Sequence, residues 1–205
     1  MGWSKLVTFI RRILELAATV KSTFEPVVQT SIYPRSQIDI FIQVLQQDGG
    51  LLQACINATT LALANAGIPL FDFVCAVTGG VHLTSPVLDL TTLEENDIPH
   101  VTIAMMPRTD KVTLVTMETR LHSDRFEEIF RLAVDAGKVI HGEMKCAFRN
   151  RTDSLVTAMG SFGPKLPPGG DLDEQMNDYW MTFRSPSNGQ FIQGVQHFRF
   201  TFNVG

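Results

Sequence analysis

Asp48, Gly49 and Gly50 form a turn of the kind that can bring a bound anion close to the backbone. Paired glycines tolerate positive φ and leave room for a ligand beside the chain. The stretch that follows, 51–66, is predicted to be helical, and its N-terminus would attract negative charge at the same place. On the pattern alone a plain structural turn is the commoner reading, because phosphate-binding loops are a minority of such turns.

The elements on both sides of this turn have clear patterns. From residue 37 to residue 45, β-branched side chains alternate with other types, which predicts a half-buried strand. The alternating residues are Ile38, Ile40, Ile42 and Val44. Residues 51–66 are rich in Ala and Leu, and Gly67 suits the position just after a helix. The sequence therefore predicts a strand, a glycine turn and a helix in succession.

The next segments predict a mixed α and β chain. Residues 73–77 are a short apolar run ending at Gly79-Gly80, and residues 87–90 are another. Residues 101–106 and 111–117 are predicted strands joined by a turn at 107–110, which indicates a hairpin. A helix is expected to begin with Ser123 or Asp124 as its cap. Its apolar face reaches Met144, and Lys145 is placed near its end.

The two ends of the chain have weaker patterns. Residues 1–18 predict an amphipathic helix capped by Ser4 and packed on the domain, and they resemble neither a signal peptide nor a membrane span. Residues 153–205 are expected to be a poorly ordered tail, because they are rich in glycine and proline. The alternation of Phe198, Phe200 and Phe202 leaves an additional edge strand as the alternative.

Composition limits the function classes. The chain has 205 residues, a formal charge of -4 and a pI near 5.7, which suits one domain with appendages and argues against broad, charge-driven nucleic-acid binding. The basic candidates for local RNA contact are Arg35, Arg108 and Lys111, followed by Arg120 and Arg125. The cysteines and histidines show no metal-ligand spacing, so we expect no metal and no cofactor.

Several ordered blocks of sequence resemble one known family. They are PRSQIDIFIQVLQQDGG at 34–50, ACINATTLALANAGIP at 54–69, DFVCAVTGG at 72–80, LDLTTLEE at 88–95, and the segment 101–133. Together they resemble the RNase PH family, and within it the RNA exosome ring subunits closest to bacterial RNase PH. The resemblance covers residues 23–152. It leaves an unmatched amphipathic helix at 1–22 and an unmatched tail at 153–205.

The resemblance implies an α/β (α+β) fold of the ribosomal S5 domain 2-like type. Such proteins have a mixed sheet with helices on one face, and six related subunits form a ring around an RNA channel. The N-terminal half of that fold is expected to be incomplete here, so residues 23–152 would be a partial RNase PH-like domain. An incomplete sheet would expose a strand edge, which is an aggregation hazard.

The first departure from the family concerns phosphate. Active members cleave RNA by phosphorolysis, and a hydroxyl and an arginine directly after the glycine turn hold the attacking phosphate. Here those positions are Leu51 and Leu52. Neither side chain can donate a hydrogen bond, and leucine beside a phosphate would cost several kcal/mol in uncompensated desolvation. The resemblance therefore implies that these phosphate-binding positions have lost their function.

The second departure concerns acid–base chemistry. Active members carry two aspartates six residues apart for metal binding or proton transfer, and Asp89 and Glu95 stand at the matching positions. The longer glutamate displaces its carboxylate, and a displacement of about 1 Å can cost roughly 100-fold in rate. We therefore expect no catalytic residues, with Asp89 and Glu95 as remnants of the pair.

These observations favour a non-catalytic structural subunit of the exosome ring, as animal versions of this subunit are. It would support 3′-to-5′ RNA processing, including that of ribosomal RNA, and RNA degradation by lining an RNA channel. The expected partners are other RNase PH-like subunits, cap subunits, RNA and hydrolytic nucleases, without a membrane. The expected locations are the nucleus, the nucleolus and the cytoplasm. The alternatives are a phosphate-dependent 3′-to-5′ exoribonuclease and a truncated, non-functional isoform.

Overall fold

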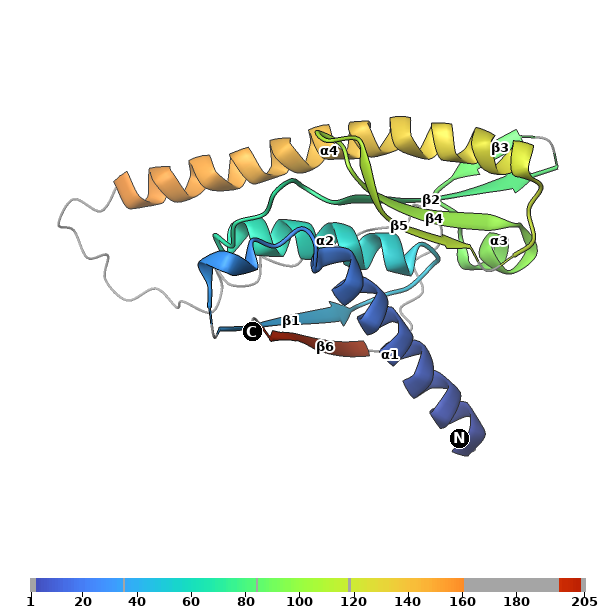
Figure 1. Cartoon of the computed structure of the whole chain (residues 1–205), viewed down its shortest axis with the longest axis horizontal. Helices are drawn as coiled ribbons and strands as arrows, with labels where there is room; N and C mark the ends of the chain where they lie inside the picture. Colours follow the sequence, from blue (N-terminus) through green and yellow to red (C-terminus); the bar gives the residue numbers. More distant parts are fainter. Residues whose placement is uncertain (1–2, 35, 84, 118, 161–195, 204–205) are drawn as a thin grey trace.

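A computed structural model describes residues 3–34, 36–83, 85–117, 119–160 and 196–203. Its larger elements are shown in Figure 1. In chain order they are α1 (Trp3–Phe24), β1 (Gln37–Val44), α2 (Leu51–Asn65), β2 (Cys75–His82), β3 (Ser85–Leu88), α3 (Thr92–Asp97), β4 (His100–Met106), β5 (Lys111–Met117), α4 (Ser123–Gly160) and β6 (Gln196–Asn203). A short 3₁₀ helix, Thr30–Ile32, lies between α1 and β1.

The elements stack in layers. A four-stranded antiparallel sheet in the order β3-β2-β4-β5 has α4 on one face and α2 on the other, and the β1-β6 pair lies beyond α2 (Figure 1). The layer between α4 and the sheet is built around Val77, Val101, Ile103 and Ala133. A larger core joins α1, α2 and β1 to the opposite face of the sheet, where Val74, Ala76 and Ala104 lie.

The fold class that the resemblance implied is confirmed, with two differences of detail. All four strands of the sheet are antiparallel, whereas a mixed sheet was expected. Helices cover both faces of the sheet, whereas helices on one face were expected. Both faces of β2 are apolar because its strand is buried on both sides, as its nearly continuous burial shows.

The predicted strand, turn and helix are confirmed at 37–65. In β1, Ile40 and Val44 are buried while Gln37 and Phe41 are exposed, which is the alternation expected of a half-buried strand. The helix α2 ends at Asn65, and Gly67 follows with a φ of 74°. The predicted hairpin of 101–106 and 111–117 is also present, as β4 and β5.

Helix α1 is longer than the predicted segment 1–18. It begins at Trp3, so Ser4 lies inside the helix and cannot be its cap. It continues to Phe24, beyond the predicted end at residue 18. Val20 and Phe24 are fully buried in the larger core, so these last turns pack against the rest of the fold. The first turns project from the body of the fold (Figure 1), and Val7 and Leu14 are exposed.

Strand β2 runs through Gly79 and Gly80, where the sequence indicated a stop. Both glycines are paired, Gly79 with Leu88 and Gly80 with Val87. A Cβ at Gly79 would lie 2.8 Å from the Cγ2 atom of Ile129 in α4. The glycine therefore allows α4 to approach the strand closely and is not a turn signal.

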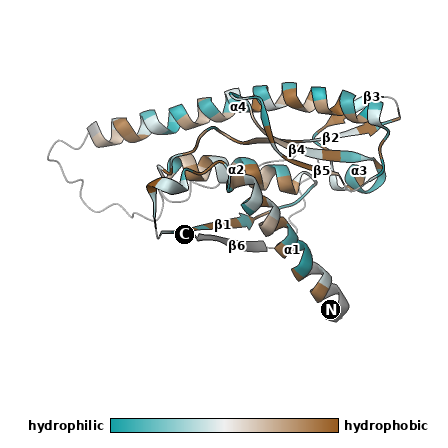
Figure 2. Cartoon of the chain, in the orientation of Figure 1, coloured by the Kyte–Doolittle hydropathy of each residue, from teal (hydrophilic) through white to brown (hydrophobic). Residues whose placement is uncertain are grey.

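Helix α4 differs from its prediction at both ends. His122, just before the helix, takes the capping position expected of Ser123 or Asp124, because its Nδ1 atom accepts a hydrogen bond from the N–H of Asp124 at 3.4 Å. The helix then continues beyond Lys145 to Gly160. Teal and brown alternate along it in Figure 2, whereas brown dominates in β1. Its last turns contain Leu155, Val156 and Met159, but they are mostly exposed and extend no buried face.

The expected disorder of the tail 153–205 is wrong where the structure describes it. Residues 153–160 are helical, and residues 196–203 form β6, which pairs antiparallel with β1 from Gln37↔Asn203 to Val44↔Gln196. The edge-strand alternative for Phe198, Phe200 and Phe202 is therefore the one observed. Residues 161–195 and 204–205 lie outside the described part of the chain, so the prediction is not tested there.

Candidate functional site

The glycine turn lies against the segment that leads into α3. Gly49 and Gly50 have φ values of 85° and 58°, which are left-handed conformations. A Cβ at Gly49 would lie 2.7 Å from the carbonyl carbon of Thr91 and 2.9 Å from the amide nitrogen of Thr92. The turn is therefore a tight backbone-to-backbone contact, which agrees with the plain structural turn that the pattern favoured over an anion site.

Leu51 and Leu52 are both partly buried and pack against the larger core. Two leucines in the first turn of α2 thus extend the apolar layer beneath the sheet. They place hydrocarbon where the resemblance implied a hydroxyl and an arginine. The first turn of α2 contains no acidic residue, and Gly50 provides no side-chain cap.

A polar stripe on α2 bonds to the backbone around β2. The Oε1 atom of Gln53 accepts the N–H of Thr78 at 2.5 Å, and the hydroxyl of Thr60 donates to the carbonyl of Val74 at 2.8 Å. Between them, Asn57 both donates to and accepts from Ala76, at 3.0 and 2.8 Å. Because β3 pairs with β2 only from Gly79 to His82, this stripe satisfies backbone groups that β3 does not reach.

The acidic pair faces the start of α2. One carboxylate oxygen of Glu95 accepts the N–H of Gly50 at 2.7 Å. The Oδ1 atom of Asp89 accepts the side-chain N–H of Gln53 at 2.8 Å. The structure thus brings together the sequence-predicted site residues Leu51, Leu52, Asp89 and Glu95 around one turn, and it occupies both carboxylates with hydrogen bonds from that turn and helix.

Helix α3, which presents Glu95, is fixed by its own cap. The hydroxyl of Thr91 accepts the N–H of Glu94, and the Glu94 carboxylate accepts the N–H of Thr91, which is a capping box. The bond from the Thr91 N–H holds the pKa of Glu94 below its ordinary value. The cap fixes where α3 begins, and so fixes the position from which Glu95 reaches Gly50.

The two sides of this arrangement fall within two matched family domains. Residues 10–69 match the family described as "3′ exoribonuclease family, domain 1", and residues 72–136 match "3′ exoribonuclease family, domain 2". Together the two matches cover well over half of the chain. The chain belongs to the RNase PH family. The first match begins at residue 10, inside the helix that the sequence resemblance left unmatched.

Individual relatives of this RNase PH-like chain are named as exosome components. It is 42% identical to "Exosome complex component ski6" of Schizosaccharomyces pombe over 149 residues, which are 73% of this chain and 62% of that protein. It is 37% identical to "Exosome complex component RRP41" of Mus musculus over 151 residues, with the same two coverages. The chain thus spans less than two thirds of the length of these relatives.

One solved structure supports the fold. The crystal structure of rice (Oryza sativa) Rrp46 matches with a TM-score of 0.55, over 66% of this chain and 65% of that one. Its sequence identity is 21%, so the likeness concerns the fold alone.

The boundary between the two family matches falls at residues 70 and 71, between α2 and β2. The turn and α2 therefore belong to the first family domain, and the acidic pair belongs to the second.

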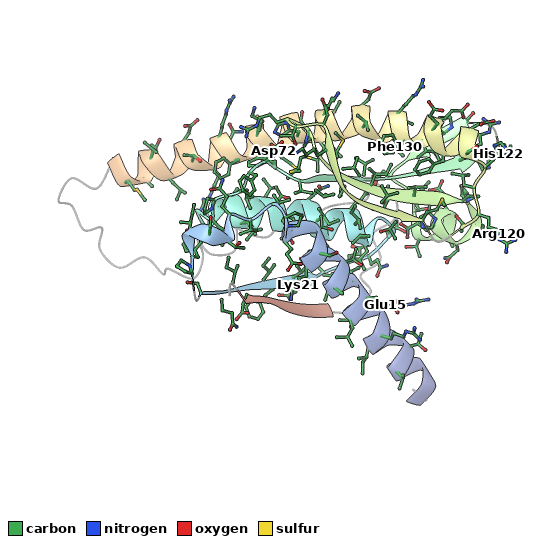
Figure 3. The ribbon with its side chains drawn as sticks, viewed as in Figure 1. Glu15, Lys21, Asp72, Arg120, His122 and Phe130 are labelled. Carbon is green, nitrogen blue, oxygen red and sulfur yellow. The ribbon has the colours of Figure 1, made fainter. Side chains whose placement is uncertain are left out.

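The basic candidates of this RNase PH-like chain do not form one surface. Arg108 donates from its backbone to Asp72 at 3.0 Å and from its guanidinium to the carbonyl of Phe71 at 2.9 Å, so it ties the β4–β5 turn to the start of β2. Figure 3 places Asp72 and Arg120 at opposite ends of the sheet. Lys111 is exposed at the start of β5, and Arg35 lies outside the described residues.

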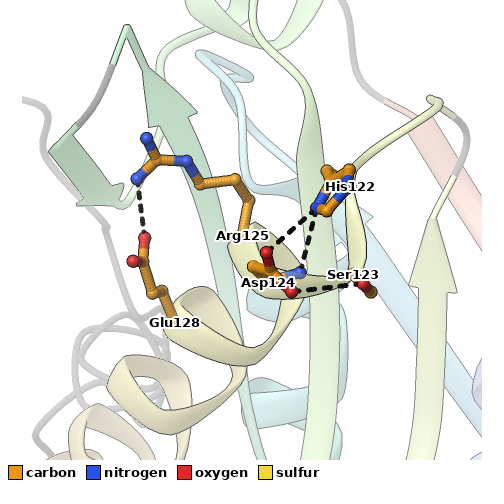
Figure 4. Close-up of polar contacts among 5 residues, drawn as sticks. All are labelled: His122, Ser123, Asp124, Arg125 and Glu128. Atoms are coloured by element: carbon orange, nitrogen blue, oxygen red, sulfur yellow. Dashed lines mark hydrogen bonds and ion pairs between the residues drawn. The ribbon is translucent and has the colours of Figure 1, made fainter.

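Arg125 is placed at the first turn of α4 together with acidic neighbours. Its guanidinium bonds to the carboxylate of Glu128 at 2.9 Å, while His122 contacts Asp124 at 3.4 Å (Figure 4). The positive charge of Arg125 is therefore locally balanced. Arg108, Lys111 and Arg120 are the exposed candidates. Lys111 begins β5, and Arg120 lies just after its end.

Sequence reasoning missed a polar centre at Asp72. This side chain is 7% exposed and accepts the backbone N–H groups of Phe73 and Arg108. Nearby, the rings of Phe73 and His141 meet edge to face at 5.8 Å. Burial, and then the charge of Lys145, lower the pKa of His141. An aspartate before an apolar run was the only signal for this centre in the sequence.

The described residues contain no group of three or more His, Cys, Asp or Glu side chains arranged to hold a metal ion. No helix among them is long and apolar enough to cross a membrane. The acidic pair thus stands without a third ligand in the described part of the chain.

Proposed function

We propose that this chain acts as a non-catalytic structural subunit of an RNA exosome ring. The family membership and the names of the relatives support the ring assignment. The observation that carries the non-catalytic assignment is the packing of Leu51 and Leu52 against the larger core. Apolar side chains that cover a core cannot compensate the charge of an attacking phosphate.

The acidic pair supports the same proposal. One oxygen of Asp89 and one oxygen of Glu95 accept hydrogen bonds from α2 or its turn, so each carboxylate is partly engaged on that side. A carboxylate that is held in this way is poorly placed to transfer a proton to RNA. The subunit would then contribute surface to an RNA channel, while hydrolytic nucleases bound to the ring carry out degradation.

The partners and locations follow from this role. The proposed neighbours are other RNase PH-like subunits and the cap subunits, and RNA would pass through the shared channel. The proposed locations are the nucleus, the nucleolus and the cytoplasm, with ribosomal RNA among the processed substrates. Lys111 and Arg120 are exposed cations that remain as RNA-contact candidates, whereas the guanidinium of the exposed Arg108 donates to the carbonyl of Phe71.

A phosphorolysis assay tests the loss of catalysis. The purified chain is mixed with single-stranded RNA labelled at its 3′ end and with inorganic phosphate, and released nucleoside diphosphate is measured. We expect no phosphate-dependent release, while an active family member releases product under the same conditions. Release that requires phosphate and disappears in Asp89→Asn would overturn the non-catalytic assignment.

Affinity purification tests the ring assignment separately. The tagged chain is recovered from its own cell type, and the co-purifying proteins are identified by mass spectrometry. We expect other ring and cap subunits. Recovery of chaperones alone would show that a chain of this length does not assemble, and the structural role would be withdrawn.

A further inference from the structure

We propose that Asp89 and Glu95 form a clasp between the two family domains. In this clasp, their carboxylates hold the first turn of α2 against β2 and α3. The proposed function treats the same two residues as non-catalytic. In the clasp they have a structural role, which is to hold the two family domains together. It depends on the folded geometry of this chain and can be tested without RNA or partner subunits.

The side-chain contacts of the clasp cross the domain boundary. Gly50 and Gln53 lie in the domain at 10–69, whereas Thr78, Asp89 and Glu95 lie in the domain at 72–136. Gln53 joins two of these groups at once, since its Oε1 atom accepts the N–H of Thr78 and its Nε2 atom donates to Asp89. Gly50 is bonded independently to Glu95. The start of α2 is thus held at two points.

Glu95 also supplies charge that α2 lacks. The N-terminus of a helix carries partial positive charge, and α2 has neither an acidic residue in its first turn nor a side-chain cap. The carboxylate of Glu95 lies 2.7 Å from the amide nitrogen at the cap position. It therefore occupies the position that an external anion would need in order to approach the same amide.

The length of the glutamate side chain matters for this contact. An aspartate at position 95 would withdraw the carboxylate by about 1.5 Å, the length of one C–C bond. The backbone cannot follow, because the capping box fixes α3 and Gly49 already lies at contact distance from Thr91 and Thr92. The glutamate that departs from the family pattern is thus the residue type whose reach fits the turn.

Asp89 is held by its backbone as well as by its side chain. Its φ is 59°, a left-handed value that aspartate adopts more readily than most residues. In this conformation its N–H donates to the carbonyl of Thr78 at 3.0 Å while its carboxylate meets Gln53. Asp89, Gln53 and Thr78 therefore form a closed set of hydrogen bonds between β2 and α2.

Amide hydrogen exchange of the full chain tests the clasp. In Glu95→Asp and Glu95→Ala, we expect exchange at Gly50 to accelerate by about tenfold or more, as loss of one charge-assisted hydrogen bond would allow. Glu95→Gln keeps the length and one acceptor oxygen, so its effect is expected to be smaller. Asp97→Asn, an exposed acid on the same helix, is the matched control and should leave exchange at Gly50 unchanged.

A double-mutant cycle tests the second point of the clasp. Gln53→Ala and Asp89→Ala should each accelerate exchange at Thr78, and the double variant should be less affected than the sum of the two in free energy. Additive effects would overturn the Asp89–Gln53 link. Equal exchange at Gly50 in the parent and in both Glu95→Asp and Glu95→Ala would overturn the Glu95 link.

The clasp and the proposed function fail in different experiments. If Glu95→Asp and Glu95→Ala leave the exchange unchanged while phosphorolysis is absent, the chain is non-catalytic but has no clasp. If exchange responds as expected while phosphate-dependent release is observed, the clasp exists in an active enzyme.

Discussion

Asn57 in α2 and Ala76 in β2 exchange two hydrogen bonds. The Nδ2 atom of Asn57 donates to the carbonyl of Ala76 at 3.0 Å, and its Oδ1 atom accepts the N–H of Ala76 at 2.8 Å. A neighbouring strand would satisfy the same two backbone groups in a sheet. A helix side chain therefore completes β2 at a point that β3 does not reach, since β3 pairs only with residues from Gly79 onward.

Removing this amide should destabilise the fold. Asn57→Ala leaves the N–H and the carbonyl of the fully buried Ala76 without partners, and each such loss costs about 1–3 kcal/mol. We expect the free energy of unfolding to fall by about 2–4 kcal/mol in denaturant titrations. Asn65→Ala, at an exposed position of the same helix, is the control and should change it by less than about 0.5 kcal/mol. Equal losses in the two variants would contradict the role of Asn57.

Two glycines in left-handed conformations allow backbone strain to be separated from crowding. Gly49→Ala and Gly67→Ala both place an alanine at positive φ, which costs about 1–2 kcal/mol. A Cβ at Gly67 meets nothing within 4 Å, whereas one at Gly49 would collide with the backbone of residues 90–92. We therefore expect Gly49→Ala to be clearly more destabilising in thermal or chemical unfolding. Similar losses would mean that the turn can move away from α3.

Cysteine labelling should distinguish one thiol from the other two. Burial raises the pKa of Cys55 to about 12, and burial followed by the charge of Asp72 raises the pKa of Cys75 to about 12. The thiolate is the reactive form, so both should resist a maleimide at pH 8 in the folded protein. Cys146 is exposed on α4 and should react first.

Mass spectrometry after short labelling times measures this difference. Cys146→Ser should abolish the fast phase, and denaturant should make the remaining cysteines reactive. Rapid labelling of Cys55 in the folded protein would contradict the position of α2 against the core, because Cys55 belongs to that core.

His141 should give the fold a pH dependence below neutrality. Burial, with the charges of Lys145 and Arg108, lowers the pKa of His141, and the charge of Asp72 opposes this shift. The unfolded chain then binds a proton more tightly than the folded chain does. The stability contribution is complete above the ordinary histidine pKa of about 6.5 and is lost as the pH falls from there.

Unfolding titrations between pH 5 and 7.5 measure this contribution. The parent protein should lose more stability on acidification than His141→Gln, which cannot be protonated. Identical pH profiles in the two proteins would show that the imidazole near Phe73 titrates equally in the folded and unfolded states.

The elements predicted most accurately from the sequence are those whose local residue pattern matches their burial in the fold. The alternation from Ile38 to Val44 and the glycine at residue 67 are local signals, and β1 and α2 have the predicted bounds within a residue. The last turns of α4 were not predicted, although Leu155 and Met159 continue the helical spacing of Met144. Gly79 and Gly80 were misread because their close contacts are tertiary: α4 approaches Gly79 through Ile129, and Leu90 and Pro99 approach Gly80.

The candidate site was predicted in its members but not in its chemistry. Leu51, Leu52, Asp89 and Glu95 do meet at one turn. What single-residue reasoning could not supply is the hydrogen bonding among them, because it depends on segments about 40 residues apart in the chain. The spacing of Gln53, Asn57 and Thr60 places them on one face of α2, and that polar stripe in an apolar helix was the available signal.

The pairing of β1 with β6 bears on how the molecule is made. The hairpin of β4 and β5 joins neighbours and can form while the chain is still being synthesised, but β1 pairs with residues 196–203, almost at the end of the chain. Closing so long a loop is entropically costly and slow. The edge of β1 that pairs with β6 therefore stays unpaired until residues 196–203 have been synthesised, and an unpaired strand edge is the kind of surface that a chaperone would protect.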